Sequence, residues 1–263
     1  VPHWSRHFPF PARLHWQQTD NPDWLYFPAC VTRIFGGSTL GKDDLITVVM
    51  RVAARAGLRL SLPRDMHGLC CSQIWQHKGD PAGQAEIANR TVEAFFRLSD
   101  HGSVPIMCDT TSCTHTMLKG MRYALTDENR TKFDSLTIVD ITRWLDEAVM
   151  PRLEVTRPKD SVLLQPTCAA RLLGLDDAMC RVAAKCARRV TVPVDCQCCG
   201  AAGDRGFIYP QVARSATADE RREIACDRFD GCYSLARTCE ISMSDTIGRE
   251  YESIVYLVDE TTE

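Results

Sequence analysis

Residues 196–206 contain the side chains of this chain that are best suited to chemistry. Cys196, Cys198 and Cys199 place three thiols within four positions, and a glycine-rich turn then leads to Arg205. Adjacent cysteines are poor disulfide partners because the ring that they would close is strained. Thiolates gathered beside flexible glycines are instead typical of a metal or iron–sulfur site. The stretch by itself leaves open that these are only small buried apolar side chains.

The other cysteines strengthen the metal hypothesis. The chain has 14 cysteines in 263 residues, and a chain of this length can bury a core without a disulfide framework. We therefore expect a reducing compartment with metal-bound or reactive thiols. Cysteines also follow successive predicted strands, at Cys30, Cys70, Cys71, Cys108 and Cys168.

Composition narrows the class of protein. A hydrophobic content of 44% and a charged content of 25% are typical of a soluble globular protein with one large or two ordinary domains. The net charge of -3 does not indicate the basic surface that a nucleic-acid-binding protein needs. We find no apolar run long enough for a transmembrane segment and no secretory leader, so we expect a cytoplasmic location, or a peripheral one at the membrane. A start without Met and an abrupt acidic end indicate a piece of a longer protein.

The elements that must position the thiols alternate between strands and helices. Residues 1–24 are expected to form an extended aromatic-rich arm that packs on a neighbouring surface (Trp4, Phe8, Phe10, Trp16 and Trp24), with a disordered linker as the alternative. The apolar pattern then predicts strands at 24–27, 58–62, 104–107, 136–139, 162–164, 190–194 and 254–258. Helices are predicted at 39–57, 80–98, from about 113, and at 141–149, 176–188 and 211–225. This alternation predicts parallel α/β units, in which loops after the strands meet along one edge.

An internal duplication divides the chain. Residues 27–36 match residues 165–174, with Pro, Cys, Arg and Gly in identical places. The vicinal pair 70–71 matches 198–199, Lys78 matches Arg205 within one position, Cys113 matches Cys239, and residues 138–140 are aligned with 257–259. Five matches in one order indicate a repeat. We therefore predict two tandem pseudo-symmetric lobes, residues 25–150 and 151–263, each a small parallel sheet flanked by helices with cysteines at the carboxyl ends of the strands.

These residues resemble the cysteine-rich CCG-repeat domain. The phrases that carry the resemblance are Tyr26-Phe27-Pro28-Ala29-Cys30-Val31-Thr32-Arg33, Cys198-Cys199-Gly200-Ala201-Ala202-Gly203-Asp204-Arg205-Gly206-Phe207 and Arg237-Thr238-Cys239-Glu240-Ile241. That domain occurs in heterodisulfide reductase subunits, in the iron–sulfur subunit of glycolate oxidase and, most similar to this chain, at the C-terminus of large FAD-linked D-lactate dehydrogenases. The resemblance covers about residues 24–260.

The resemblance implies an electron-transfer module that holds one or two iron–sulfur clusters of the 4Fe-4S type. FAD and a ferredoxin-like segment would lie on parts of the same polypeptide outside this sequence. Electrons would pass towards a quinone, a cytochrome or a partner protein. Substrate chemistry would occur elsewhere, so no catalytic acid, base or nucleophile is assigned.

The expected ligands number four in each half. The late Cys-x-x-Cys of the family is absent from both copies, because four residues separate Cys108 from Cys113 and six separate Cys232 from Cys239. Cys196 is expected to be a spare or alternate ligand, and Cys108 an additional candidate. Four thiols suit either an iron–sulfur cluster or zinc. The predicted sets are Cys30, Cys70, Cys71 and Cys113 in the first half, and Cys168, Cys198, Cys199 and Cys239 in the second.

Four cations are expected to raise the potential of the clusters. Arg33 and Arg171 each come three residues after the first cysteine of a copy, and Lys78 and Arg205 follow the vicinal pairs. Ser72, in place of the family glycine, is expected to restrict the backbone of the first site. Cys180, Cys186 and Cys226 are interpreted as buried structural thiols, and His77 and His115 as ordinary polar residues rather than zinc ligands.

Two other classes of function remain open from sequence. Vicinal thiols beside Arg205 could carry out metal-free thiol–disulfide chemistry. The chain could also be a structural zinc module that docks other domains.

Overall fold

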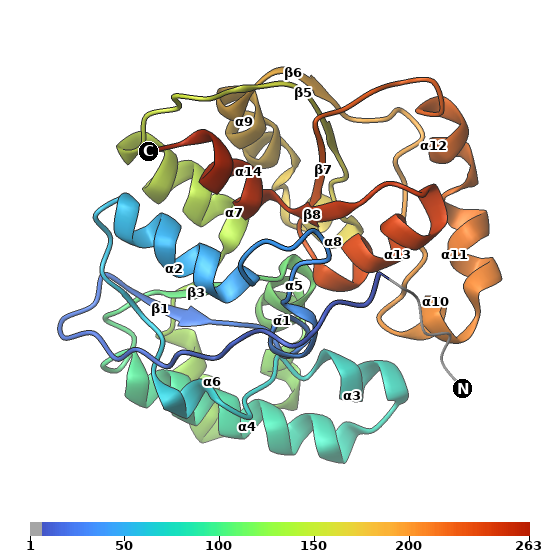
Figure 1. The fold of residues 1–263 in the computed structure, drawn as a ribbon. Coiled ribbons are helices and arrows are strands. Elements are labelled where there is room, and N and C mark those ends of the chain that lie inside the picture. Colours follow the sequence, from blue (N-terminus) through green and yellow to red (C-terminus); the bar gives the residue numbers. More distant parts are fainter. Residues whose placement is uncertain (1–6) are drawn as a thin grey trace.

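Two four-stranded parallel sheets form the frame of the molecule (Figure 1). The computed structural model describes residues 7–263, so Trp4 lies outside the described residues. The first sheet has the order β2-β1-β3-β4, and the second has the order β6-β5-β7-β8. Identical order in two parallel sheets confirms the α/β fold with two lobes. The strands are β1 (Trp24–Phe27), β2 (Leu60–Ser61), β3 (Ile106–Cys108), β4 (Ile138–Asp140), β5 (Lys159–Leu164), β6 (Ala187–Thr191), β7 (Gly231–Ser234) and β8 (Tyr251–Ser253).

Helices connect the strands of each sheet. In the first lobe they are α1 (Cys30–Phe35), α2 (Leu45–Arg55), α3 (Gln73–Lys78), α4 (Pro81–Leu98), α5 (Thr111–Lys119), α6 (Asp127–Asp134) and α7 (Ile141–Trp144). In the second lobe they are α8 (Cys168–Leu173), α9 (Asp176–Cys186), α10 (Arg205–Ile208), α11 (Pro210–Ala216), α12 (Ala218–Glu223), α13 (Arg237–Ile247) and α14 (Ile254–Thr261). Short 3₁₀ turns occur at Arg64–Met66, Met121–Ala124 and Met150–Arg152, and one π turn at Leu145–Val149.

The end of the chain differs from the prediction. Residues 254–258 lie in α14 and not in a strand, because the Ser253 side chain caps Val255 and the whole segment is buried. A short apolar run does not distinguish a buried strand from a buried helix. The last two strands are β7 and β8, so residues 138–140 correspond to residues 251–253. The alignment of 138–140 with 257–259 was therefore wrong.

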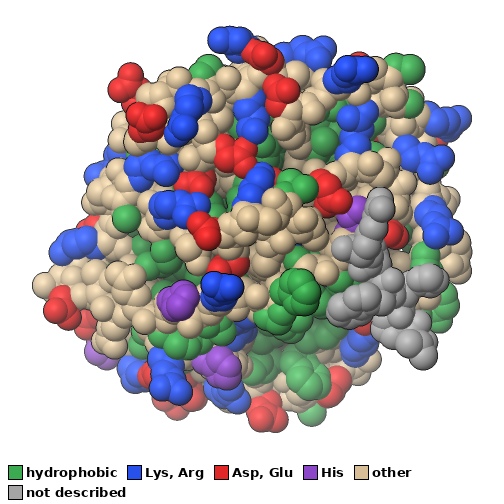
Figure 2. All heavy atoms as spheres, viewed as in Figure 1, with side chains coloured by type: hydrophobic (Ala, Val, Ile, Leu, Met, Phe, Trp, Pro, Cys, Tyr) green, Lys and Arg blue, Asp and Glu red, His purple; other side chains and the backbone are tan. Residues whose placement is uncertain are grey.

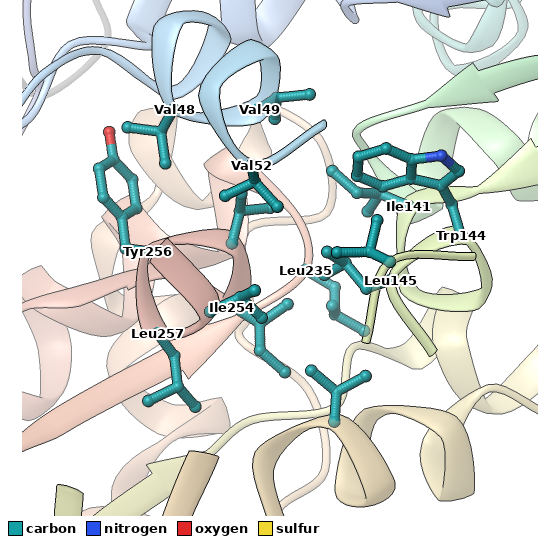
Figure 3. Packing of buried hydrophobic residues seen from close by; sticks show 14 of the residues in the cluster. Val48, Val49, Val52, Ile141, Trp144, Leu145, Leu235, Ile254, Tyr256 and Leu257 are labelled. Atoms are coloured by element: carbon teal, nitrogen blue, oxygen red, sulfur yellow. The ribbon is translucent and has the colours of Figure 1, made fainter. Parts of the chain in front are cut away.

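One hydrophobic core joins the two lobes. Helix α2 packs against α14, with Val48 and Val52 of α2 facing Tyr256 and Ile254 of α14 in one cluster (Figure 3). The same cluster includes residues of α7 and α9, which also contact each other. Since α2 and α9 occupy equivalent places in the two repeats, as do α7 and α14, these contacts form a pseudo-symmetric pair. A separate smaller core lies within each lobe.

The described part of the arm crosses both lobes. Gln17 forms an isolated antiparallel bridge with Leu62. The Phe8 ring packs edge-on against Phe35 of the first lobe and Phe207 of the second, with centroids 5.2 and 4.8 Å away. Phe10, in contrast, is 86% exposed. The arm thus contacts its neighbours through some of its aromatic residues and not others.

The surface mixes both signs of charge. Figure 2 shows basic and acidic side chains interspersed over the upper part of one face, and an apolar area below its centre. No helix within residues 7–263 is long and apolar enough to span a membrane.

Candidate functional site

The thiols of each lobe lie at the carboxyl ends of parallel strands. Cys30 is the first residue of α1, directly after β1, and Cys168 is the first residue of α8, after β5. Asp109 accepts a hydrogen bond from the Ala29 nitrogen at 2.9 Å, and Thr167 caps α8 through the Ala170 nitrogen at 3.1 Å. Both helices therefore begin at a fixed point with a thiol at the first position.

In the first lobe, four predicted thiols lie beside one another in a row. Cys30 neighbours Cys70, Cys70 neighbours Cys71, and Cys71 neighbours Cys113 on α5. Thr91 of α4 holds the vicinal pair in place, since its hydroxyl donates to the Cys70 carbonyl at 3.0 Å and accepts from the Cys70 nitrogen at 3.3 Å. The structure thus brings the predicted set together.

The second lobe repeats this row. Cys168 neighbours Cys198, Cys198 neighbours Cys199, and the Sγ atoms of Cys199 and Cys239 are 2.9 Å apart. The Ser242 hydroxyl of α13 donates to the Cys199 carbonyl at 2.7 Å. In both lobes, the row therefore runs from the first cysteine through the vicinal pair to the late cysteine.

The thiol with the lowered pKa stands at the same place in each row. Hydrogen bonds from the Cys30 and Cys71 thiols lower the pKa of Cys70, and those from Cys168 and Cys199 lower the pKa of Cys198. The pKa values of the neighbouring thiols shift in the opposite direction. Contact with Cys70 raises the pKa of Cys30, and contact with Cys198 raises the pKa of Cys168. A thiolate is the form that binds metals and attacks disulfides.

The residue after each vicinal pair has the same backbone conformation. Gly200 has φ +69°, and Ser72 adopts φ +69° despite its side chain. A non-glycine residue in this left-handed region is strained. The serine therefore keeps the backbone conformation of the glycine in the other copy and adds strain to the first site.

Cys108 is buried more deeply than the four thiols of the first row. It is the last residue of β3, fully buried, and its thiol neighbours that of Cys113. Strand register pairs Cys108 with Asp140 and Ser234 with Ser253, whereas Cys232 pairs with Tyr251. The counterpart of Cys108 is therefore Ser234, so Cys108 and Cys232 are not equivalent.

Cys196 faces a buried polar group rather than the row of thiols. Its Sγ lies 2.9 Å from the Gln165 side-chain amide, and Arg171 Nη2 donates to it at 3.2 Å. Burial, with the Glu220 carboxylate nearby, raises the pKa of Cys196 to about 12. Within the described residues, the Cys196 thiol has no hydrogen bond to any of the four thiols in the row of the second lobe.

The rest of this polar group was not predicted from sequence. With its amide nitrogen turned towards Glu220, Gln165 donates to both carboxylate oxygens at 3.0 Å, and the Tyr251 hydroxyl lies 3.2 Å from one of them. Burial raises the pKa of Glu220 to about 7. Gln165 precedes Pro166 in the repeat, where the first copy has Phe27, and this apolar-to-polar difference was the available signal.

The four predicted cations divide into two kinds. Arg33 and Arg171 lie at the thiol loops, where Arg33 donates to the Met66 and Leu69 carbonyls and Arg171 to those of Cys196 and Gln197. Lys78 instead forms an exposed ion pair with Asp204 of the other lobe at 2.7 Å. Arg205 begins α10, and within residues 7–263 it has no hydrogen bond or ion pair to a thiol.

The remaining cysteines and histidines lie elsewhere. Cys186 is buried and Cys180 half-buried, but Cys226 is exposed, so its interpretation as a buried structural thiol was wrong. The His77 ring lies beside Gly203 of the other lobe. His115 is on α5, two residues after Cys113.

The thiol rows are not arranged around a single ion. Among the described residues, no three Cys, His, Asp or Glu side chains form a group that could hold one metal ion. Tetrahedral zinc, with Zn–S bonds of about 2.3 Å, would need sulfurs about 3.8 Å apart, which exceeds the 2.9 Å between Cys199 and Cys239. An iron–sulfur cluster takes its thiolates on different irons, so its ligands need not converge on one point. Cys199 and Cys239 would still have to separate.

Two buried polar atoms at the first site have no hydrogen-bond partner within the described chain. They are Nε of Arg33 and the hydroxyl of Ser72. Buried donors are normally paired, and the sulfur atoms of a bound cluster would supply acceptors. The donor set and these two atoms fit an iron–sulfur group.

The comparisons with known proteins identify no family for this chain. No family model matches the chain, and no curated protein matches it. Among solved structures, the chain is similar to an aspartate racemase homologue from Pyrococcus horikoshii. The two share 10% sequence identity with a TM-score of 0.32, over 90% of this chain and 96% of the other.

Proposed function

We propose that this chain is an iron–sulfur electron-transfer module of the kind found at the C-terminus of FAD-linked D-lactate dehydrogenases. The observation that carries the proposal is the repeated row of thiols, in which the four cysteines follow one another in the same order in both lobes. One 4Fe-4S cluster per lobe would be held by Cys30, Cys70, Cys71 and Cys113, and by Cys168, Cys198, Cys199 and Cys239. When bound, each cluster supplies a one-electron donor and acceptor.

The protein residues prepare these sites. The lowered pKa of Cys70 and Cys198 favours the deprotonated form of one thiol in each row, which would be the first ligand. The Gly200 nitrogen lies 3.4 Å from the Cys198 Sγ and donates to it, which favours the thiolate. Burial of Cys71, Cys113, Cys199 and Cys239 excludes water from one side of each site.

The partners follow from this proposal. The flavin and ferredoxin-like domains would belong to the same polypeptide, and the final acceptor would be a quinone, a cytochrome or another protein. We propose a cytoplasmic location, with peripheral membrane association as the alternative. No substrate-binding or catalytic residue is assigned within this chain.

A metal-free thiol–disulfide function is the second candidate. The short Cys199–Cys239 contact favours this function, because the 2.9 Å between the two Sγ atoms is less than the separation of about 3.8 Å between two thiolates bound to one zinc ion. A thiolate at Cys198 beside that pair would suit disulfide exchange.

Anaerobic reconstitution tests the proposal. The purified chain would be incubated with iron and sulfide, desalted, and assayed for iron, acid-labile sulfide and electron paramagnetic resonance after reduction. We expect a brown protein with a cluster signal. A colourless protein that binds zinc but not iron, or one that binds neither metal and reversibly loses two thiols on oxidation, would contradict the proposal.

Single cysteine variants assign the ligands. Cys198→Ser and Cys239→Ser should each remove about half of the bound iron, because they affect one of two sites. Exposed Cys226→Ser is the matched control and should retain all of it. Cys196→Ser should behave like the control, because its thiol contacts Gln165 and Arg171.

A further inference from the structure

The two repeat arginines make equivalent hydrogen bonds to main-chain carbonyls of the thiol loops, and Arg171 in addition pairs with Asp176 at 3.6 Å and donates to the Cys196 thiol at 3.2 Å. Arg33 lies one helical turn after Cys30 on α1, and Arg171 lies one turn after Cys168 on α8. Arg33 donates through Nη2 to the carbonyl of Leu69, the residue directly before Cys70. Arg171 donates through Nη1 at 3.4 Å to the carbonyl of Gln197, the residue directly before Cys198.

Each guanidinium also reaches a second carbonyl of the same loop. Arg33 Nη1 donates to Met66 at 3.4 Å, and Arg171 Nη2 donates to the Cys196 carbonyl. Met66, Leu69 and Cys196 are at most 3% exposed, so three of the four carbonyls belong to buried residues, whereas Gln197 is exposed. Buried carbonyls outside regular ladders need donors from elsewhere, and a planar guanidinium can serve two of them from fixed directions.

We infer that Arg33 and Arg171 are positioning residues, each of which ties the helix that carries the first thiol of a site to the main chain that carries its vicinal pair. The first thiol and the vicinal pair lie far apart in the sequence, so a contact between their segments is needed to hold them together. The guanidinium therefore fixes the separation of three of the four thiols in each lobe. The inference rests on the proposed function insofar as those thiols bind one group together.

Substitution of each arginine by lysine distinguishes a positioning role of the side chain from an effect of its charge. Arg33→Lys and Arg171→Lys keep the positive charge, but a single ammonium cannot reproduce the paired donation. Arg181→Lys is the matched control, because Arg181 forms an ion pair with Asp146 away from the thiols, at 2.6 Å. The unaltered lobe of each variant is a second, internal control.

Hydrogen–deuterium exchange of the metal-free chain is the first readout. We expect amides at residues 66–72 to exchange about tenfold faster in Arg33→Lys, and those at 196–200 about tenfold faster in Arg171→Lys, as for the loss of one hydrogen bond from a charged donor. The other lobe and Arg181→Lys should exchange like the parent chain. Unchanged exchange at the targeted loop would overturn the inference, whether or not the parent chain binds iron.

Cluster loading is the second readout. After anaerobic reconstitution, each lysine variant should bind about half of the parent's iron, with the loss confined to its own lobe. Faster exchange with full iron binding would overturn the claim that the arginine sets thiol separation. A parent chain that binds no iron would contradict the proposed function, while the exchange result would still decide the role of the arginine.

Discussion

The ionisation of Glu220 can be tested by measuring stability as a function of pH. Its carboxylate is 2% exposed, accepts from the Gln165 amide and the Tyr251 hydroxyl, and has a pKa raised to about 7 by burial. A carboxyl with a raised pKa binds its proton more tightly in the folded state than in the unfolded one. The folded state therefore loses stability as pH rises from the ordinary pKa of 4.5 to about 7.

Glu220→Gln should remove that part of the pH dependence. We expect the variant to gain stability relative to the parent, by a few kcal/mol, as pH rises from 5 to 8, because it has no charge to bury. Urea unfolding of the metal-free chain at four pH values measures this difference. Exposed Glu86→Gln is the control. A difference between Glu220→Gln and the parent that does not change with pH would contradict the prediction.

At the scale of the element, the turn after each vicinal pair decides how the thiols are presented. Gly200 and Ser72 share φ +69°, so both turns need the left-handed conformation. A Cβ at Gly200 would lie 2.4 Å from the Ala213 Cα, so only glycine fits there. Ser72 is accommodated, but its buried hydroxyl has no partner within the described chain.

Ser72→Gly should stabilise the chain. Glycine relieves the left-handed strain and removes the unpaired hydroxyl, while it adds backbone entropy to the unfolded state. The expected net gain is about 1 kcal/mol in the free energy of unfolding, measured with urea on the metal-free chain. A loss of stability would mean that the serine hydroxyl has a partner that the structure does not contain.

Gly200→Ala should act in the opposite direction. The clash with α11 adds to the backbone strain, so we expect a loss of about 2–4 kcal/mol. Gly174→Ala is the matched control, because Gly174 has φ +66° and open space around its Cβ position. It should lose only about 1 kcal/mol. Equal losses in the two variants would show that the contact with Ala213 is unimportant.

At the scale of the molecule, a pseudo-twofold relation joins the lobes through the helices that carry the thiols. Helix α1 packs against α13, and α8 packs against α5 (Figure 1). These are equivalent contacts, since α1 corresponds to α8 and α5 to α13. Each helix of one site is therefore supported by a helix of the other site. Arg237 of α13 strengthens this interface by donating to the Phe35 and Gly37 carbonyls of the first lobe.

Arg237→Met should strongly destabilise the chain. Arg237 also pairs at 2.7 Å with Glu240, and the two side chains are 5% and 2% exposed. Removal of one partner leaves a buried, unpaired carboxylate, which costs about 3–5 kcal/mol. Urea unfolding measures the loss, and the double variant Arg237→Met/Glu240→Gln should recover much of it.

An exposed ion pair between the lobes, Lys78 with Asp204, is the control for that experiment. Lys78 and Asp204 are about half exposed, and such pairs contribute less than about 1 kcal/mol. Lys78→Met should therefore change stability little. A loss in Lys78→Met as large as that in Arg237→Met would contradict the prediction that burial of the Arg237–Glu240 pair is what makes its disruption costly.

Much of the fold and of the candidate site could be predicted from the sequence. The repeat phrases around Cys30 and Cys168 and the alternation of strand and helix patterns were local signals, and they predicted the α/β lobes and the eight thiols that the structure places in two rows. The strand predicted at 254–258 failed because an apolar run carries no information on whether its neighbours are strands or helices. Register between β7 and β8, which separates Cys108 from Cys232, is likewise set by pairing across the sheet.

The sequence by itself determined which residues repeat and in which order the thiols come, because both are properties of the chain alone. Only the tertiary structure decided what each repeated residue touches. In it, Arg33 and Arg171 donate to main-chain carbonyls, and Lys78 forms an ion pair between the lobes. Cys196 lies beside Gln165 and Glu220. The reason is that side-chain partners come from segments far apart in the sequence, and packing of the two sheets around a shared core selects them.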